Sequence, residues 1–129
     1  MTKTPSLGWS DDKIVQSIHR WSVERSKCGF DALRYNKMDT DYLTPGIKIL
    51  KNRGKESLAK LLPMLEDANR EVRLTAASIA YQIDTAACRK VLRDLMETPD
   101  GVGLMAWAAL YQLDPSVAPT PIELWGEQP

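Results

Sequence analysis

The chain has 129 residues, of which 43% are hydrophobic and 26% are charged. This length and composition predict one globular domain spanning residues 1–129, and exclude both a disordered chain and a pair of ordinary domains. No apolar run approaches the roughly 18 residues that a membrane span requires, and the first residues lack the apolar core of a signal peptide, so we expect a cytoplasmic protein without a membrane partner.

Charge is balanced in number but not in position. All 17 Lys and Arg residues lie at or before Arg93, where they outnumber 11 acidic residues, and the remaining positions carry six acidic residues and no basic one. We therefore expect a molecule with one basic and one acidic end. Such asymmetry can orient a charged partner, although solvated faces of opposite sign are the commoner outcome.

A first helix is predicted from Ser10 to about Lys27, after an extended segment over residues 1–9. Ser10 is a favourable N-cap, and the two aspartates that follow it suit the positive end of a helix dipole. Gly29 is the expected C-cap. One stripe of this helix carries Ile14, Ile18, Trp21 and Arg25.

No residue set in the chain specifies a reaction. His19 is the only histidine, and no Ser, Cys or carboxylate pattern marks a catalytic partner for it. Cys28 and Cys88 are far apart and lack CxxC spacing, so we expect two buried thiols without a disulfide framework or a metal site. We predict no enzyme, no catalytic residue and no cofactor.

The segment from residue 30 to residue 54 allows alternatives. Phe30 to Asp41 is compatible with either a short helix or an ordered loop. Thr44 and Pro45 predict a helix start, with the end near Gly54, but a helix that begins near Asp39 and kinks at the proline fits as well. Basic residues are concentrated at Lys48, Lys51, Arg53, Lys55 and Lys60, with the spacing of a solvated helix face.

The sequence pattern of a helical hairpin occurs twice, with an offset of thirty residues. Tyr81-Gln82-Ile83-Asp84 returns as Tyr111-Gln112-Leu113-Asp114. The same offset aligns apolar, helix-spaced positions: Leu62 with Leu92, Leu65 with Leu95, Val72 with Val102, Ala76 with Ala106 and Ile83 with Leu113. A repeat of this kind predicts stacked helical hairpins.

Two hairpins and a tail follow from this repeat. The first hairpin begins at Lys55 with a helix that Pro63 should bend, and its second helix reaches Ile83. The next hairpin pairs Thr85–Glu97 with Val102–Leu113. Residues 115–129 contain four prolines, so we expect an extended tail that lies along the last hairpin and caps the open end of the stack.

The stretch from Leu61 to Ala77 resembles a HEAT repeat, with leucines and a proline in the first helix and Val-Arg followed by alanines in the second. Asp67 and Arg73 match the Asp and Arg that typically brace the turn in that family. In the second copy Glu97 and Gly103 stand at these positions, so the brace is missing there. The resemblance implies an all-α fold, a short right-handed α-α superhelix of about three helical hairpins with a Pro-rich C-terminal tail.

Over roughly Val23 to Pro121 the chain also resembles the small bacterial family called domain of unknown function 2019. The shared features are a basic helix ending Lys51-Asn-Arg-Gly, the Leu-Leu-Pro and Val-Arg-Leu-Thr-Ala-Ala blocks, and a closing Leu-Asp-Pro. This resemblance implies a compact armadillo-like fold without known enzyme activity. Small bacterial proteins of this helical type are often immunity partners of toxins.

The second helix of each hairpin carries apolar residues on two faces. A helix that is apolar on both sides must be covered on both sides, or it exposes an apolar surface that can bind a partner. We expect the second face to be concave and to bind a protein, or else to be covered by the tail through Ile122 and Trp125 or by a second copy. The predicted partner-binding residues are Arg70, Leu74, Tyr81, Leu104, Trp107 and Tyr111.

The sequence therefore favours a non-enzymatic protein–protein interaction module, an immunity protein that neutralises a toxin or an adaptor, which is a monomer or a weak homodimer. The alternative is a HEAT-like protein that binds nucleic acid through the basic segment 48–60, which has fewer bases and aromatics than such footprints usually have. An enzyme is the third reading.

Overall fold

The computed structural model describes residues 4–29 and 31–126, and all regular secondary structure in these ranges is helical. The prediction of an all-α, repeat-like fold is therefore confirmed. None of the described helices has the length and apolarity needed to cross a membrane. The elements are α1 (Asp11–Ser26), α2 (Ala32–Met38), the π-helical turn η1 (Asp39–Leu43), α3 (Thr44–Arg53), α4 (Lys55–Ala59), the 3-10 helix η2 (Leu62–Glu66), α5 (Arg70–Ile79), α6 (Thr85–Leu95), α7 (Gly101–Leu113), the 3-10 helix η3 (Pro115–Val117) and α8 (Pro121–Trp125).

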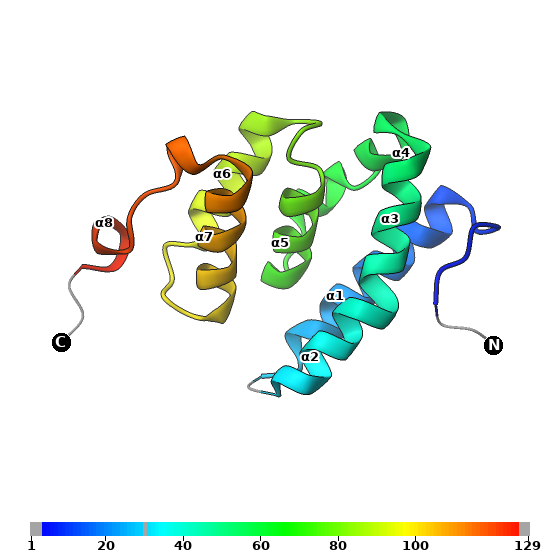
Figure 1. Cartoon of the computed structure of the whole chain (residues 1–129), viewed down its shortest axis with the longest axis horizontal. Coiled ribbons are helices and arrows are strands. Elements are labelled where there is room, and N and C mark those ends of the chain that lie inside the picture. Colours follow the sequence, from blue (N-terminus) through cyan, green and yellow to red (C-terminus); the bar gives the residue numbers. More distant parts are fainter. Residues whose placement is uncertain (1–3, 30, 127–129) are drawn as a thin grey trace.

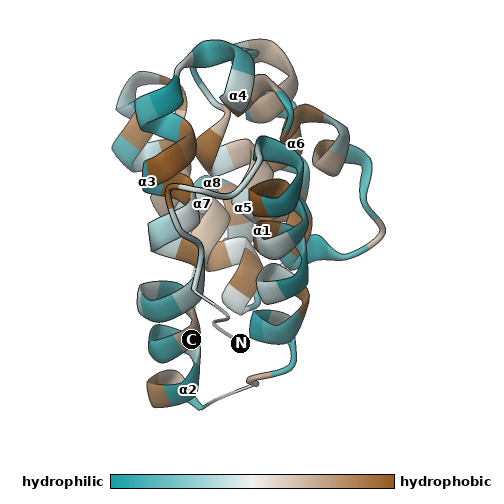
Figure 2. Ribbon diagram, turned by 90° about the vertical axis from the view of Figure 1, so that its right-hand side faces the viewer, coloured by the Kyte–Doolittle hydropathy of each residue, from teal (hydrophilic) through white to brown (hydrophobic). Residues whose placement is uncertain are grey.

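Three hairpins make up the stack. The first pairs α1 with the α2–α3 segment, the second pairs η2, which follows α4, with α5, and the third pairs α6 with α7. Figure 1 shows α3, α5 and α7 following one another along the long axis of the molecule, with the two termini at opposite ends. In Figure 2 hydrophobic segments gather in the middle of the stack, whereas α4 at its top is mainly hydrophilic.

Helix α1 forms as its caps and apolar stripe predict. The Ser10 hydroxyl accepts a hydrogen bond from the Lys13 amide at 3.1 Å, which satisfies one of the free N–H groups of the first turn. Ile14 and Ile18 are fully buried, and Trp21 stacks on Tyr42 with 4.0 Å between ring centroids. This stripe packs α1 against α3 and α5.

The α2–α3 segment resolves the alternatives that the sequence leaves open. Helix begins at Ala32 and continues to Arg53, interrupted only by the π turn, so the chain is already helical well before Pro45. Proline has no N–H to donate to the carbonyl four residues earlier, and a π turn widens the helix at that point. Within it the Thr44 amide bonds the Asp39 carbonyl, five residues back. Gly54, with φ of +113°, ends α3.

The first helix of the second hairpin is broken rather than bent. Helix α4 ends at Ala59, and the chain continues as the 3-10 helix η2. Pro63 has no N–H to donate to the Ala59 carbonyl four residues earlier, so the α-helix cannot continue there. The Met64 amide bonds the Leu61 carbonyl at 3.0 Å in this tighter turn. Leu61 and Leu65 are buried all the same, so the apolar edge predicted here still faces the core.

The thirty-residue repeat is preserved in packing but not at its end. Leu65 and Leu95 are both buried, as are Ala76 and Ala106. Helix α5, however, stops at Ile79, because the chain must turn into α6, where the Asp84 side chain caps the Ala87 amide. In the second copy α7 continues through Leu113, and within the described residues only η3 and α8 follow it.

The N-terminal segment is tied to the basic stretch through Asp11. Its carboxylate accepts hydrogen bonds from Arg53 at 2.7 Å and Ser57 at 2.8 Å, and lies 3.1 Å from the Lys60 ammonium. Arg53 also donates to the carbonyls of Leu7 and Trp9, at 2.9 and 2.7 Å. Two of the five basic residues in segment 48–60 therefore have a structural role.

We expect Asp11→Asn to lower the stability at neutral pH and to leave it nearly unchanged near pH 2. Hydrogen bonds, chiefly from Arg53, lower the pKa of Asp11 from 3.8 to about 2. A depressed carboxyl pKa contributes stability above the unfolded value, and this contribution is lost as the pH falls from about 4 to about 2. Urea unfolding of both forms between pH 2 and 7 measures the difference.

Asp12→Asn is the matched control, because Asp12 is the adjacent, exposed residue in the same helical turn. Its unfolding curve should follow that of the wild type across the range. Equal losses in the two variants would mean that the general charge of the first turn, and not the bonds of Asp11, is responsible.

The tail is more ordered than the predicted extended segment 115–129, whose last three residues lie outside the described range. It contains η3 and α8, and Thr120 caps α8 through a reciprocal capping box with Glu123. The indole of Trp107 donates to the Pro119 carbonyl at 2.7 Å, and that of Trp125 donates to the Met96 carbonyl at 2.8 Å. The tail thus lies against the last hairpin, as expected.

Candidate protein-binding surface

Helix α7 has no charged residue in thirteen positions, yet one side of it is exposed. Its buried side packs Ala106 and Leu110 against α5 and α6. A surface helix normally has charged or polar residues opposite its buried stripe. Here the opposite side carries Leu104, Met105, Ala108 and Tyr111, which we call the α7 face; the exposed fractions are 53% for Leu104, 47% for Met105 and 57% for Tyr111.

Trp107 lies at the edge of the α7 face. Its ring is half-buried, stacks on Tyr111 with 5.4 Å between centroids, and is held by the hydrogen bond to Pro119. The tail therefore covers part of Trp107 but leaves Leu104 and Tyr111 exposed. The predicted alternative, in which the tail covers this surface through Ile122 and Trp125, does not hold for Ile122, which is itself 64% exposed.

Two of the predicted partner-binding residues are buried, which corrects the expectation of a continuous exposed face on both second helices. Leu74 is 4% exposed, because α3 and α7 flank the side of α5 that carries it. Tyr81 is 2% exposed, because α5 has ended and the turn directs the phenol inward, where it donates to Asp114 at 3.3 Å. Of the two tyrosines in the repeat, only Tyr111 remains available.

Arg70, the sixth predicted residue, is a brace between hairpins. Its guanidinium pairs with Asp100, the N-cap of α7, and donates to the Leu95 carbonyl at 3.1 Å. These bonds lower the pKa of Asp100, with the Arg70 hydrogen bonds as the largest cause. The pair joins the starts of α5 and α7, which are the two second helices of the repeat, so Arg70 lies beside the α7 face without belonging to it.

The α7 face borders a groove between α3 and α7, with α5 as its floor. The groove has a volume of about 240 Å³ and continues into a second hollow of similar volume, which shares Arg25 and Met105 with it. Ile47 of α3 stands on one side and Met105 of α7 on the other. The apolar wall and floor of the groove comprise Ile47, Leu74, Ile79, Met105, Ala108 and Ala109.

A buried ionic cluster lies where the groove meets the second hollow. Arg25 of α1, only 8% exposed, donates to Glu71 at 3.1 Å, to Asp39 at 2.8 Å and to Thr75 at 2.9 Å. Its guanidinium also stacks over the Tyr35 ring at 4.9 Å. Burial raises the pKa of Glu71, against the opposing effect of Arg25. In the sequence, the only indication of this cluster is Arg25 itself, which lies on the otherwise apolar stripe of α1.

The Asp67–Arg73 brace takes a different form from the one that the resemblance implies. Arg73 donates to the backbone carbonyl of Asp67 at 2.7 Å, and the Asp67 carboxylate instead lies 2.8 Å from Nε2 of His19. The pKa of Asp67 is lowered mainly by the hydrogen bond from the Asn69 backbone amide, and next by the contact with His19. His19 therefore has a carboxylate partner 48 residues away that no local pattern could indicate.

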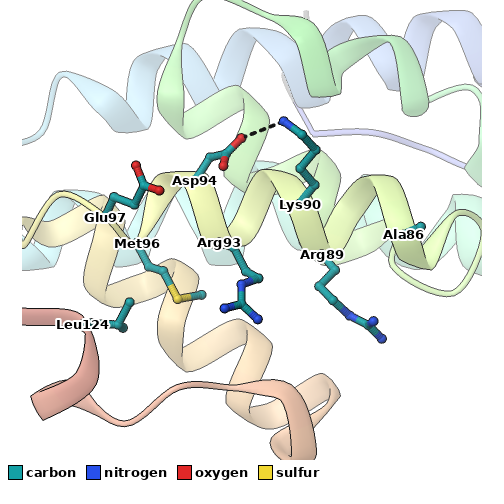
Figure 3. A pocket seen from close by; sticks show the side chains of 8 residues that line it. All are labelled: Ala86, Arg89, Lys90, Arg93, Asp94, Met96, Glu97 and Leu124. Atoms are coloured by element: carbon teal, nitrogen blue, oxygen red, sulfur yellow. Dashed lines mark hydrogen bonds and ion pairs between the residues drawn. The ribbon is translucent and has the colours of Figure 1, made fainter.

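A further hollow of about 450 Å³ separates α6 from the C-terminal segment (Figure 3). Arg89 and Arg93 point toward that segment, whereas Lys90, Asp94 and Glu97 point to the opposite side. Arg89 is paired with Asp114 at 3.1 Å. This hollow thus lies between α6 and the C-terminal segment, and it shares no lining residue with the α7 face.

Other chemistry is sparse in the described part of the chain. No group of three His, Cys, Asp or Glu side chains there is arranged to hold a metal ion. Both cysteines are buried, and burial raises the pKa of the Cys88 thiol to about 11, so it is a poor nucleophile at neutral pH. The α7 face and its groove are therefore the features to which a function can be assigned.

Comparisons with protein-family models, with curated proteins and with solved structures give no match for this chain.

Proposed function

We propose that the chain is a non-enzymatic protein-binding module that holds its partner on the α7 face. The observation that carries the proposal is the exposed side of α7. This side is apolar, and the helix contains no charged residue that would favour its contact with water. Within this class, the sequence resemblance favours an immunity protein, and an adaptor is the other role.

Covering the α7 face would contribute appreciably to affinity. Full burial of a large apolar side chain is worth about 1.5–3 kcal/mol, so covering three half-exposed ones yields roughly 3 kcal/mol. That gain corresponds to an affinity increase on the order of 100-fold. Leu104, Met105 and Tyr111 supply it. Tyr111 also has the aromatic character that is enriched at binding hot spots.

We expect Ala108→Arg to abolish partner binding without unfolding the protein. Ala108 is exposed in the centre of the α7 face, and an arginine there places a charge and a long side chain into the contact. The affinity should fall at least about tenfold, the effect of 1.4 kcal/mol. The test is affinity capture with tagged protein from the cells that express it, followed by titration of each recovered protein in purified form.

Gln82→Arg is the matched control, because Gln82 is exposed and is the repeat counterpart of Gln112 on α7. A genuine partner is retained by this variant and lost from Ala108→Arg. If every recovered protein binds both variants as tightly as the wild type, the α7 face is not the binding surface. Recovery of nucleic acid alone by all three forms would instead favour the basic segment 48–60.

A further inference from the structure

The ionic cluster in the groove has more negative than positive charge. Two carboxylates, Glu71 and Asp39, share the single guanidinium of Arg25, and no other Lys, Arg or His in the described residues forms an ion pair with either of them. Arg25 contacts Glu71 through two of its nitrogens, at 3.1 and 3.0 Å, but contacts Asp39 through a single nitrogen, at 2.8 Å. Asp39, held by one nitrogen only, is therefore the less completely paired of the two carboxylates.

Asp39 is accessible from the groove. Its side chain is 47% exposed, and only Oδ1 is engaged by Arg25, so Oδ2 can accept a further hydrogen bond. In the adjoining hollow the buried Tyr35 hydroxyl lies near the Glu71 carboxylate. The polar end of the groove thus has one carboxylate oxygen, Oδ2 of Asp39, available to a further donor, next to an apolar wall.

This combination matches the side chain of a lysine or arginine, whose methylene stem lies on apolar surface while its charged head reaches a carboxylate. We infer that the groove between α3 and α7 receives a Lys or Arg side chain from a partner segment, paired with Asp39, while neighbouring apolar residues of that segment cover the α7 face. This inference rests on the proposed function and specifies the chemistry of the partner.

The distribution of charge favours another protein over a second copy as the occupant. All residues after Arg93 are acidic or neutral, and the α7 face lies within that part of the chain. Two copies that joined through this face would bring acidic ends together, and like charges across an interface oppose association. A basic, amphipathic segment has the complementary charge.

The test uses a short helical peptide of leucine and lysine and a twin in which every lysine is replaced by glutamate. Binding is followed through the methionine methyl signals in an NMR spectrum, because Met105 lines the groove and is half-exposed, whereas Met38, Met64 and Met96 are buried. The leucine–lysine peptide should shift the Met105 signal and leave those of Met64 and Met96 in place. Met38 adjoins Asp39 and can respond as well, so Met64 and Met96 are the reference signals. The leucine–glutamate twin should not shift it.

Asp39→Asn should raise the dissociation constant of the leucine–lysine peptide by about twofold to fivefold, the effect of losing one partly exposed ion pair. Asp41→Asn is the matched control, because Asp41 is exposed on the same π turn, and it should bind as the wild type does. Ala108→Arg should abolish the Met105 shift.

Three outcomes would overturn the inference. Equal binding of both peptides, or equal binding by both Asn variants, would leave a groove that selects apolar partners without a cation, and the proposed function would still stand. A Met105 shift that depends on protein concentration alone would identify a second copy as the occupant. Failure of both peptides to shift Met105, together with unchanged protein capture by Ala108→Arg, would contradict both the inference and the proposed function.

Discussion

Replacing Gly103 with alanine is expected to destabilise the protein by about 3 kcal/mol or more, although Ala is normally the better helix former. Gly103 is a buried residue in the first turn of α7. A Cβ built there would overlap the carbonyl oxygen of Thr98 and lie 3.2 Å from that of Leu95. Both obstacles are backbone atoms, so a side-chain rotation cannot relieve them, and α7 would have to move away from the end of α6.

Gly101→Ala is the control within the same turn. A Cβ at Gly101 meets nothing within 4 Å, so alanine there should leave the stability unchanged or raise it by roughly 0.5 kcal/mol. Urea unfolding of the two variants measures the contrast. Similar stabilities for both would show that the loop before α7 can move aside freely.

The same close approach explains the departure of the second copy from the HEAT pattern. Position 103 corresponds to Arg73 in the first copy, where the guanidinium bonds the Asp67 and Ala68 carbonyls. In the second copy the backbone of α7 approaches the preceding turn directly, and there is no room for a side chain. The hairpins are instead braced by Arg70 and Asp100, one at the start of each second helix.

Local signals predicted α1 and the packing of the repeat. Ser10 caps the helix through a bond to a residue three positions away, and the stripe of α1 follows directly from the helical period. Leu65 and Leu95 are buried at matching positions because the same spacing recurs in both copies. Such features depend on near neighbours in sequence, which a single chain displays.

The candidate site depended on contacts that the sequence does not display. Leu74 is buried by elements that flank α5 on both sides, and a helical wheel of α5 alone cannot show which face they cover. Tyr81 and Tyr111 occupy equivalent positions in the repeat, yet only the second copy continues its helix and leaves the ring exposed. The groove itself forms between α3 and α7, which are separated along the chain by α4, η2, α5 and α6.

Arg25→Met should lower the free energy of unfolding by about 3–5 kcal/mol at neutral pH, because it leaves Glu71 buried without its cation. Glu71 is 6% exposed and receives its two short ionic contacts from Arg25, 46 residues away. Methionine preserves much of the volume of arginine, so the loss reports on charge and hydrogen bonding more than on packing. Urea unfolding at pH 7 measures it.

The double variant Arg25→Met with Glu71→Leu separates the unpaired charge from the value of the ion pair. Replacing both members of a buried pair by apolar residues is often nearly neutral, so the double variant should regain most of the lost stability. A double variant as unstable as Arg25→Met would mean that the hydrogen bonds of Arg25 to Asp39 and Thr75, which both variants lack, carry the stability instead.

The pH dependence of the stability of Arg25→Met is an independent test of whether Glu71 is the group left without a partner. Burial already raises the pKa of Glu71 above its ordinary 4.5, and removing the opposing effect of Arg25 raises it further. A carboxyl with a raised pKa favours the folded state most below its unfolded value and loses that contribution as the pH rises through the folded one. Relative to the wild type, Arg25→Met should therefore be less unstable at pH 5 than at pH 8, whereas a deficit independent of pH would mean that Glu71 is not the group left uncompensated.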